Sequence, residues 1–78
     1  MSIQIRKPAR KFIERQPLKA QNRIVQAIYA LPEGDIQPLR GKNGIFRLRV
    51  GDYRITFRFE DSNTIIVHHA GNRGDIYK

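Results

Sequence analysis

Residues 44–59 alternate between apolar and basic side chains, and this alternation is the strongest constraint on how the chain folds. The run reads Gly44-Ile-Phe-Arg-Leu-Arg-Val-Gly-Asp-Tyr-Arg-Ile-Thr-Phe-Arg-Phe59. Successive side chains of a strand point to opposite faces, so one face of each strand is apolar and the other carries arginine. Gly51-Asp52 interrupts the alternation and suits a two-residue hairpin turn. The segment therefore predicts a β-hairpin with an apolar face and a basic face.

A turn at Gly51-Asp52 fixes which residues of the hairpin face each other. The expected pairs are Val50 with Tyr53, Arg49 with Arg54, Leu48 with Ile55, Arg47 with Thr56, and Phe46 with Phe57. Arg49 then faces Arg54 with Cβ atoms about 5 Å apart, and like charges so placed destabilise a sheet. Two interpretations stay open: an anion relieves the repulsion, or the long guanidinium stems splay into solvent at little cost.

The composition predicts a single small domain spanning residues 1–78. With 78 residues and 40% hydrophobic content, the chain can form one modest core. The absence of cysteine excludes disulfides and thiolate metal sites, and the adjacent His68 and His69 cannot alone form a closed zinc site. No apolar run approaches the roughly 20 residues that span a bilayer, and the N-terminus lacks the apolar core of a secretory signal. We expect a soluble cytoplasmic protein with neither a membrane partner nor a small-molecule cofactor.

The charge favours an anionic partner. Fifteen Lys and Arg residues against seven Asp and Glu give a formal net charge of +8, which favours encounters with nucleic acid or with an acidic protein. Every basic residue after position 43 except Lys78 is an arginine. Guanidinium is planar, permanently charged and able to bind phosphate through two hydrogen bonds. The arginines therefore predict phosphate recognition.

The remaining segments predict an α+β fold. We expect a short edge strand at residues 3–5, helices at about residues 9–15 and 18–30, a connecting loop at residues 33–44 and a well-covered strand at residues 64–70. In the second helix the expected buried stripe is Leu18, Gln21, Ile24, Val25, Ile28 and Leu31. The predicted architecture is a short N-terminal strand and two N-terminal helices packed on a small, mainly antiparallel sheet of three to four strands.

A nuclease site for this chain is expected to work without metal. Cleavage of RNA by attack of a 2′-hydroxyl on the neighbouring phosphate needs positioning, a proton acceptor, a proton donor and stabilisation of the added negative charge. The chain has no carboxylate cluster suited to magnesium, because Asp52, Glu60 and Asp61 fall in predicted turns and Asp75 stands alone. Arginines are the groups available to stabilise the charge.

Four segments resemble the RelE/ParE toxin superfamily, on its RelE side. They are Leu39-Arg-Gly, Phe46-Arg-Leu-Arg-Val-Gly-Asp-Tyr-Arg, His69-Ala-Gly-Asn-Arg and Asp75-Ile-Tyr-Lys. The resemblance implies the toxin of a type II toxin-antitoxin system, a ribosome-dependent endoribonuclease that cleaves mRNA and inhibits translation. It also implies a cognate antitoxin, and an acidic segment that orders on binding would neutralise the basic surface. Two alternatives stay open: a ParE-like toxin that inhibits DNA gyrase without cutting RNA, and a plain nucleic-acid-binding module.

The resemblance also implies roles for individual residues. Arg47 and Arg49 match a basic pair that binds the substrate phosphate, while the catalytic groups fall on Arg54, Arg73 and Tyr77. RelE has lysines in place of this arginine pair. Lysine can lose its proton in a cationic cluster but arginine stays charged, so the pair is assigned to phosphate binding alone.

The proton acceptor is left to Tyr77, His68 or His69, since neighbouring guanidinium groups favour the phenolate and imidazole titrates near neutrality. Structural roles are the alternatives. Tyr77 could cap the core and Arg73 could be a solvated loop residue. The two histidines are expected on opposite faces of their strand, so that at least one packs. Tyr53 also matches a family position, but its apolar strand face predicts a core residue.

Overall fold

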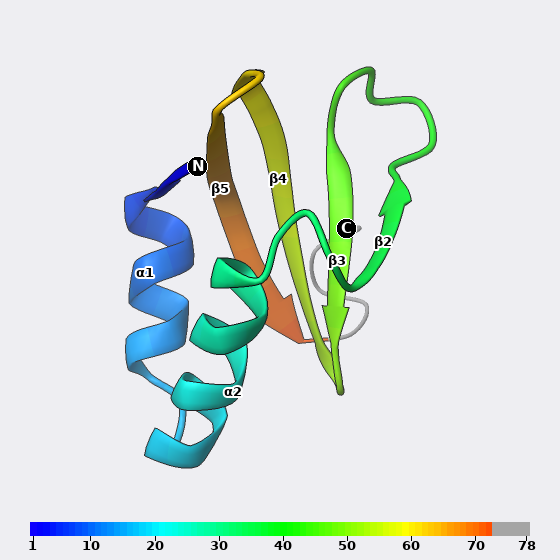
Figure 1. Cartoon of the computed structure of the whole chain (residues 1–78). Coiled ribbons are helices and arrows are strands. Elements are labelled where there is room, and N and C mark those ends of the chain that lie inside the picture. Colours follow the sequence, from blue (N-terminus) through cyan, green and yellow to red (C-terminus); the bar gives the residue numbers. More distant parts are fainter. Residues whose placement is uncertain (73–78) are drawn as a thin grey trace.

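The computed structural model describes residues 1–72, which form two helices and a five-stranded sheet (Figure 1). In chain order the elements are β1 (Ser2–Ile5), α1 (Lys7–Glu14), α2 (Leu18–Tyr29), β2 (Asp35–Pro38), β3 (Phe46–Val50), β4 (Tyr53–Asp61) and β5 (Thr64–Asn72). No helix in this part of the chain is long and apolar enough to cross a membrane. The predicted α+β class, with a short first strand and two N-terminal helices, is confirmed.

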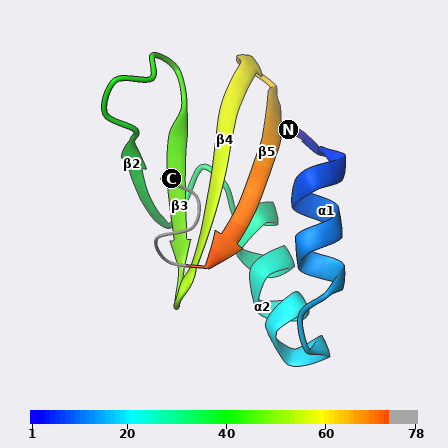
Figure 2. The same cartoon turned by 180° about the vertical axis from the view of Figure 1, so that it is seen from behind.

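The sheet has the strand order β1-β5-β4-β3-β2. β1 runs parallel to β5, and the other neighbours are antiparallel. The sheet exceeds the predicted three to four strands because residues 35–38, expected in a loop, form the edge strand β2. An edge strand tolerates Pro38, which cannot donate to a further neighbour. In both views β2 lies at the edge farthest from α1 (Figures 1 and 2).

The predicted hairpin register is confirmed at every position. The observed partners are Phe46 and Phe57, Arg47 and Thr56, Leu48 and Ile55, Arg49 and Arg54, and Val50 and Tyr53. Gly51 has a φ of +59°, whereas no non-glycine residue among residues 1–72 has a positive φ. A positive φ at the first turn residue alone is the pattern of a type II′ turn, which matches the twist of the two strands. The Gly51-Asp52 turn therefore sets which face each side chain occupies.

The bounds of α1 and α2 lie within two residues of those predicted, and a proline marks each start. Pro8 lies in the first turn of α1, and Pro17 directly precedes α2. Ile24 and Ile28 are fully buried, but Leu18, predicted in the same stripe, is 71% exposed. At 3.6 residues per turn, six residues place Leu18 about 120° around the helix from Ile24. Its place in the buried stripe was therefore wrong.

The core lies between the helix pair and one face of the sheet. α1 packs on β5 and α2 contacts β3. The buried cluster is apolar throughout: Ala9, Ile13, Ile24, Ile28, Leu31, Leu48, Val50, Ile55, Phe57, Ile65 and Val67. Phe57 stacks on Phe46 with ring centroids 5.6 Å apart, and Phe59 meets both rings edge-on. With the apolar face covered by helices, the opposite face is left to the arginines.

Candidate nucleic-acid interface

Four arginines of the hairpin lie on the sheet face opposite the helices, and we call this the arginine face. Its members from β3 are Arg47 and Arg49, and those from β4 are Arg54 and Arg58, all at positions that alternate with core residues. The pairing continues across the sheet: Asp35, Arg49, Arg54 and Gly71 form one row, and Gln37, Arg47, Thr56 and His69 form the next. The register thus gathers three of the predicted site arginines in two adjacent rows.

The arginine face is not a uniformly solvated surface. Arg47 is 5% exposed and Arg54 9% exposed, while Arg49 is exposed. A buried guanidinium must be paired or hydrogen-bonded, because losing its hydration costs several kcal/mol. The arginine face therefore holds two buried guanidinium groups, those of Arg47 and Arg54, beside the exposed one of Arg49.

Asp35 supplies an anion to two of these arginines. Nη1 of Arg47 donates to the carboxylate Oδ1 and to the backbone carbonyl of Asp35, both at 3.3 Å. Nε of Arg49 lies 3.9 Å from Oδ2 of the same carboxylate. Both open interpretations fit Arg49: an internal anion lies at 3.9 Å, and the side chain is 46% exposed to solvent. The sequence did not reveal Asp35, because its place beside Arg49 depends on the unpredicted strand β2.

His68 and His69 lie on the same side of β5, so the expected alternation was wrong. The register shifts between the pairs Thr56–His69 and Phe57–Val67, which leaves His68 as the extra residue of a β-bulge. The two rings stack with centroids 6.4 Å apart. Both imidazoles therefore join the arginine face, near Arg58.

His68 accepts a hydrogen bond from Arg58, whose Nε lies 3.1 Å from Nε2 of the imidazole. Burial is the main cause that lowers the pKa of His68, and the charges of Arg58, His69 and Arg6 lower it further. The neutral imidazole is thus favoured, which its acceptor role requires. Arg58 also forms an ion pair of 3.0 Å with Glu60.

Tyr53 lies on the helix face, as its apolar strand neighbours predicted. Its ring meets Phe12 edge-on at 5.9 Å, and its hydroxyl lies 3.2 Å from Oε1 of Gln16. The side-chain amide of Gln16 in turn donates from Nε2 to the backbone carbonyl of Phe12. These contacts make Tyr53 a packing residue between sheet and helices, so the family position it matches is not on the arginine face.

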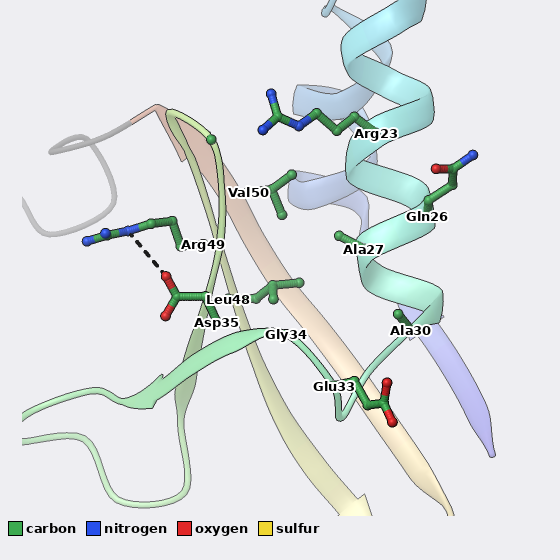
Figure 3. A pocket seen from close by; sticks show the side chains of 11 residues that line it. Arg23, Gln26, Ala27, Ala30, Glu33, Gly34, Asp35, Leu48, Arg49 and Val50 are labelled. Carbon is green, nitrogen blue, oxygen red and sulfur yellow. Dashed lines mark ion pairs between the residues drawn. The ribbon is translucent and has the colours of Figure 1, made fainter.

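A pocket of about 460 Å³ lies between α2 and the edge of β3 (Figure 3). Arg49 and Asp35 point away from α2, whereas Leu48 and Val50 point toward it (Figure 3). On the helix side, the guanidinium of Arg23 lies over the hairpin turn, 3.0–3.2 Å from the place of a Cβ on Gly51. The pocket thus joins an apolar wall to a rim of mixed charge, with Arg23 and Arg49 beside Glu33 and Asp35.

Two predicted site residues, Arg73 and Tyr77, lie outside the described residues. Their roles, and those of the other predicted site residues, stay predictions. Within residues 1–72, no group of three or more His, Asp or Glu side chains is arranged to hold a metal ion.

A family model described as the ParE toxin of the type II toxin-antitoxin system parDE matches residues 3–77. No curated protein is similar enough to this chain to count as a match. Among solved structures, a chain of the RelB-RelE antitoxin-toxin complex from Methanococcus jannaschii is 26% identical, with a TM-score of 0.76 over 95% of this chain and 94% of that one.

Two further complexes share the fold. A chain of the toxin-antitoxin complex RelBE2 from Mycobacterium tuberculosis is 23% identical, with a TM-score of 0.74 over 92% of this chain and 96% of that one. A chain of the archaeal RelE-RelB complex from Pyrococcus horikoshii is 21% identical, with a TM-score of 0.76 over 95% and 96%. At these identities the likeness concerns the fold alone.

Proposed function

This chain belongs to the ParE toxin family of type II toxin-antitoxin systems, within the RelE/ParE superfamily, and from that membership we propose a ribosome-dependent endonuclease that cleaves mRNA. The observation that carries the proposal is the arginine face, where Arg47, Arg49 and Arg54 occupy adjacent rows of the sheet. Guanidinium groups in such an array bind a phosphate and stabilise the charge that develops on it. The similar chains in RelB-RelE complexes support the RelE side of the superfamily.

The proposed reaction is a transfer within the RNA strand. The oxygen of a 2′-hydroxyl attacks the adjacent phosphorus, and the bond from phosphorus to the 5′-oxygen breaks. The products are a 2′,3′-cyclic phosphate and a free 5′-hydroxyl. One proton leaves the 2′-oxygen for an acceptor on the protein, and another is donated to the departing 5′-oxygen. The fifth bond to phosphorus, formed by the 2′-oxygen before the 5′-oxygen departs, places extra negative charge on the phosphate oxygens, and this charge is what cationic groups stabilise without a metal ion.

The residues divide between binding and chemistry. Arg47 and Arg49 bind the phosphate, Arg54 and Arg73 stabilise its developing charge, and Tyr77 transfers a proton. Of the two imidazoles, His69 is the alternative proton acceptor. His68 is less suited, because its Nε2 lone pair already accepts from Arg58.

A cognate antitoxin is the expected protein partner, and the ribosome with its mRNA is the expected target. The similar solved chains come from complexes with RelB antitoxin. A net charge of +8 favours an acidic antitoxin segment and the phosphates of ribosomal and messenger RNA. Both partners are cytoplasmic, so we place the proposed activity there.

Mapping RNA ends in a translating lysate tests the proposal. The wild-type protein should create new ends within codons at the ribosomal A site, and Arg73→Ala and Tyr77→Phe should lose these ends by about 10²-fold or more, a usual scale for charge-stabilising and proton-transfer groups. Folding of each variant is checked by circular dichroism. An intact wild-type protein that makes no new ends contradicts the proposal, and a fully active Tyr77→Phe moves proton transfer to His69 or to water.

The second candidate is inhibition of DNA gyrase, which the match to a ParE model favours. A supercoiling assay with purified gyrase separates the two functions. Inhibition of supercoiling together with intact RNA supports the ParE-like function.

A further inference from the structure

The carboxylate of Asp35 occupies donors that the proposed function assigns to a phosphate. It lies 3.3 Å from Nη1 of Arg47 and 3.9 Å from Nε of Arg49. Carboxylate and phosphate oxygens bind the same N–H groups of guanidinium. A phosphate that binds both arginines in this place therefore competes with Asp35.

The geometry makes Asp35 the partner that moves. Its side chain is 53% exposed, whereas that of Arg47 is 6% exposed. A half-exposed carboxylate is rehydrated when it turns into solvent, whereas a buried guanidinium cannot reach solvent by a similar rotation. The contacts of 3.3 Å are also longer than the 2.7–2.9 Å that is usual for bonds between charged groups. The carboxylate is thus held loosely enough to exchange.

Arg47 keeps its place when the carboxylate leaves. Its Nη1 also donates to the backbone carbonyl of Asp35 at 3.3 Å, and that oxygen belongs to a paired strand. This bond does not depend on the Asp35 side chain. The arginine is thus positioned by the backbone of β2 and neutralised by a side chain of the same residue.

We propose that the Asp35 carboxylate stands in for phosphate on Arg47 and Arg49 in the free protein and is displaced when an RNA backbone binds. The inference rests on the proposed function, because an RNA phosphate is the competing anion. The exchange would also make binding specific: only an anion that contacts both arginines compensates for the loss of the Asp35 carboxylate. Binding of RNA is then weaker than the arginines alone would allow.

The test compares the affinities of variants for a short RNA whose 2′-hydroxyls are methylated, so that binding is measured without cleavage. Asp35→Asn should bind about three- to tenfold more tightly, as expected when one charge near a phosphate is removed in water or at a protein surface. Its affinity should also fall more steeply with salt, by about 0.7 in the logarithmic slope for one added phosphate contact to a single strand. Asp35→Glu restores the carboxylate and should return the affinity toward the wild-type value.

Glu33→Gln is the matched control. It makes the same charge change two residues away, also beside the pocket, and residues 1–72 contain no ion pair to Glu33. Equal or weaker RNA binding by Asp35→Asn overturns the inference, as does an equal gain with Glu33→Gln.

The wild-type protein provides a measurement that does not depend on a variant folding. The carbon-13 shift of the Asp35 carboxylate should move as the methylated RNA is titrated in, and an unchanged shift at saturation overturns the inference. The end-mapping assay separates the two proposals. A wild-type protein that binds RNA but cuts none contradicts the nuclease alone, and one that cuts while Asp35→Asn gains no affinity contradicts the role of Asp35. A wild-type protein that binds no RNA at low salt overturns both.

Discussion

Arg49 on β3 lies directly opposite Arg54 on β4, and Asp35 on β2 flanks Arg49 from the other side. The sheet therefore sets two like charges beside each other and supplies one carboxylate next to them. A cross-strand like-charge pair costs stability, and the internal carboxylate offsets part of that cost. Such a row is unfavourable for an inert scaffold but suits a surface that binds an anion.

Arg49→Gln should separate binding from stability. We expect RNA cleavage to fall about tenfold or more, because a phosphate contact is lost. The free energy of unfolding should change by less than about 0.5 kcal/mol, since the lost contact to Asp35 is half-exposed and the loss of like-charge repulsion opposes it. Urea denaturation and end mapping measure the two effects. Arg40→Gln, an exposed residue of the loop after β2, is the control for charge alone. A comparable loss of cleavage in Arg40→Gln would show that only net charge matters.

Tyr53→Phe should affect stability but not cleavage. The substitution removes the hydroxyl near Gln16 and keeps the ring against Phe12. The expected loss is about 0.5–1.5 kcal/mol of unfolding free energy, the usual net contribution of one hydrogen bond. Thermal denaturation checks the loss, and end mapping checks the activity. A strong loss of cleavage with unchanged stability would show that Tyr53 takes part in the reaction and is not only a packing residue.

His68 should make stability depend on pH below neutrality. The fold lowers its pKa, chiefly by burial and then by Arg58, His69 and Arg6, so the unfolded chain binds a proton first as pH falls. The contribution is fully present above the ordinary value of 6.5 and is lost as pH falls through the lowered pKa.

Urea midpoints taken between about pH 7.5 and about pH 5 report this dependence. Replacing the imidazole in His68→Gln should flatten the curve in that range. His69→Gln is the control and should keep most of the dependence, because burial of His68 is unchanged. Parallel curves for wild type and His68→Gln would contradict the prediction.

Phe57→Ala should cost about 3–5 kcal/mol of unfolding free energy, since a fully buried ring is removed from the centre of the core. The chain has 78 residues and an expected total stability of about 4–12 kcal/mol, so the variant is expected to be largely unfolded on mild heating. Phe59→Ala removes a ring that is 41% exposed and should cost clearly less. Equal losses for the two variants would show that the aromatic cluster is not ordered as described.

The hairpin could be predicted because its information is local. A glycine at the turn and strict alternation on both sides determine the register, and the register determines the arginine face. The boundaries of the helices follow in the same way from proline and spacing. Within the buried stripe of the second helix, only Leu18 was misplaced. Its spacing along the sequence fits the stripe, but its angle around the helix axis puts it on another face.

What could not be predicted depends on neighbours across the sheet. Asp35–Pro38 has none of the β-branched or aromatic enrichment of a strand apart from Ile36, and it pairs because β3 offers it a free edge. The bulge at His68 arises where β5 meets β4, and no residue type signals it. These two features bring Asp35 and both histidines to the arginine face. The shared face of the hairpin arginines and the two candidate histidines were predicted from the sequence, whereas Asp35 and the common side of the histidines were missed; the roles of these residues stay predictions.

Because β1 pairs with β5, the first strand of the chain can join the sheet only after the last described strand has been made. Ser2–Ile5 emerge from the ribosome early, but their partners, Thr64 to Val67, are synthesised only after every other described element except the end of β5. Contacts so distant along the chain form slowly. In a chain that is still being synthesised, Ile3 and Ile5 therefore have no sheet partner until residues 64–67 have been made. This edge of the sheet therefore closes only once residues 64–67 are available to pair with Ser2–Ile5.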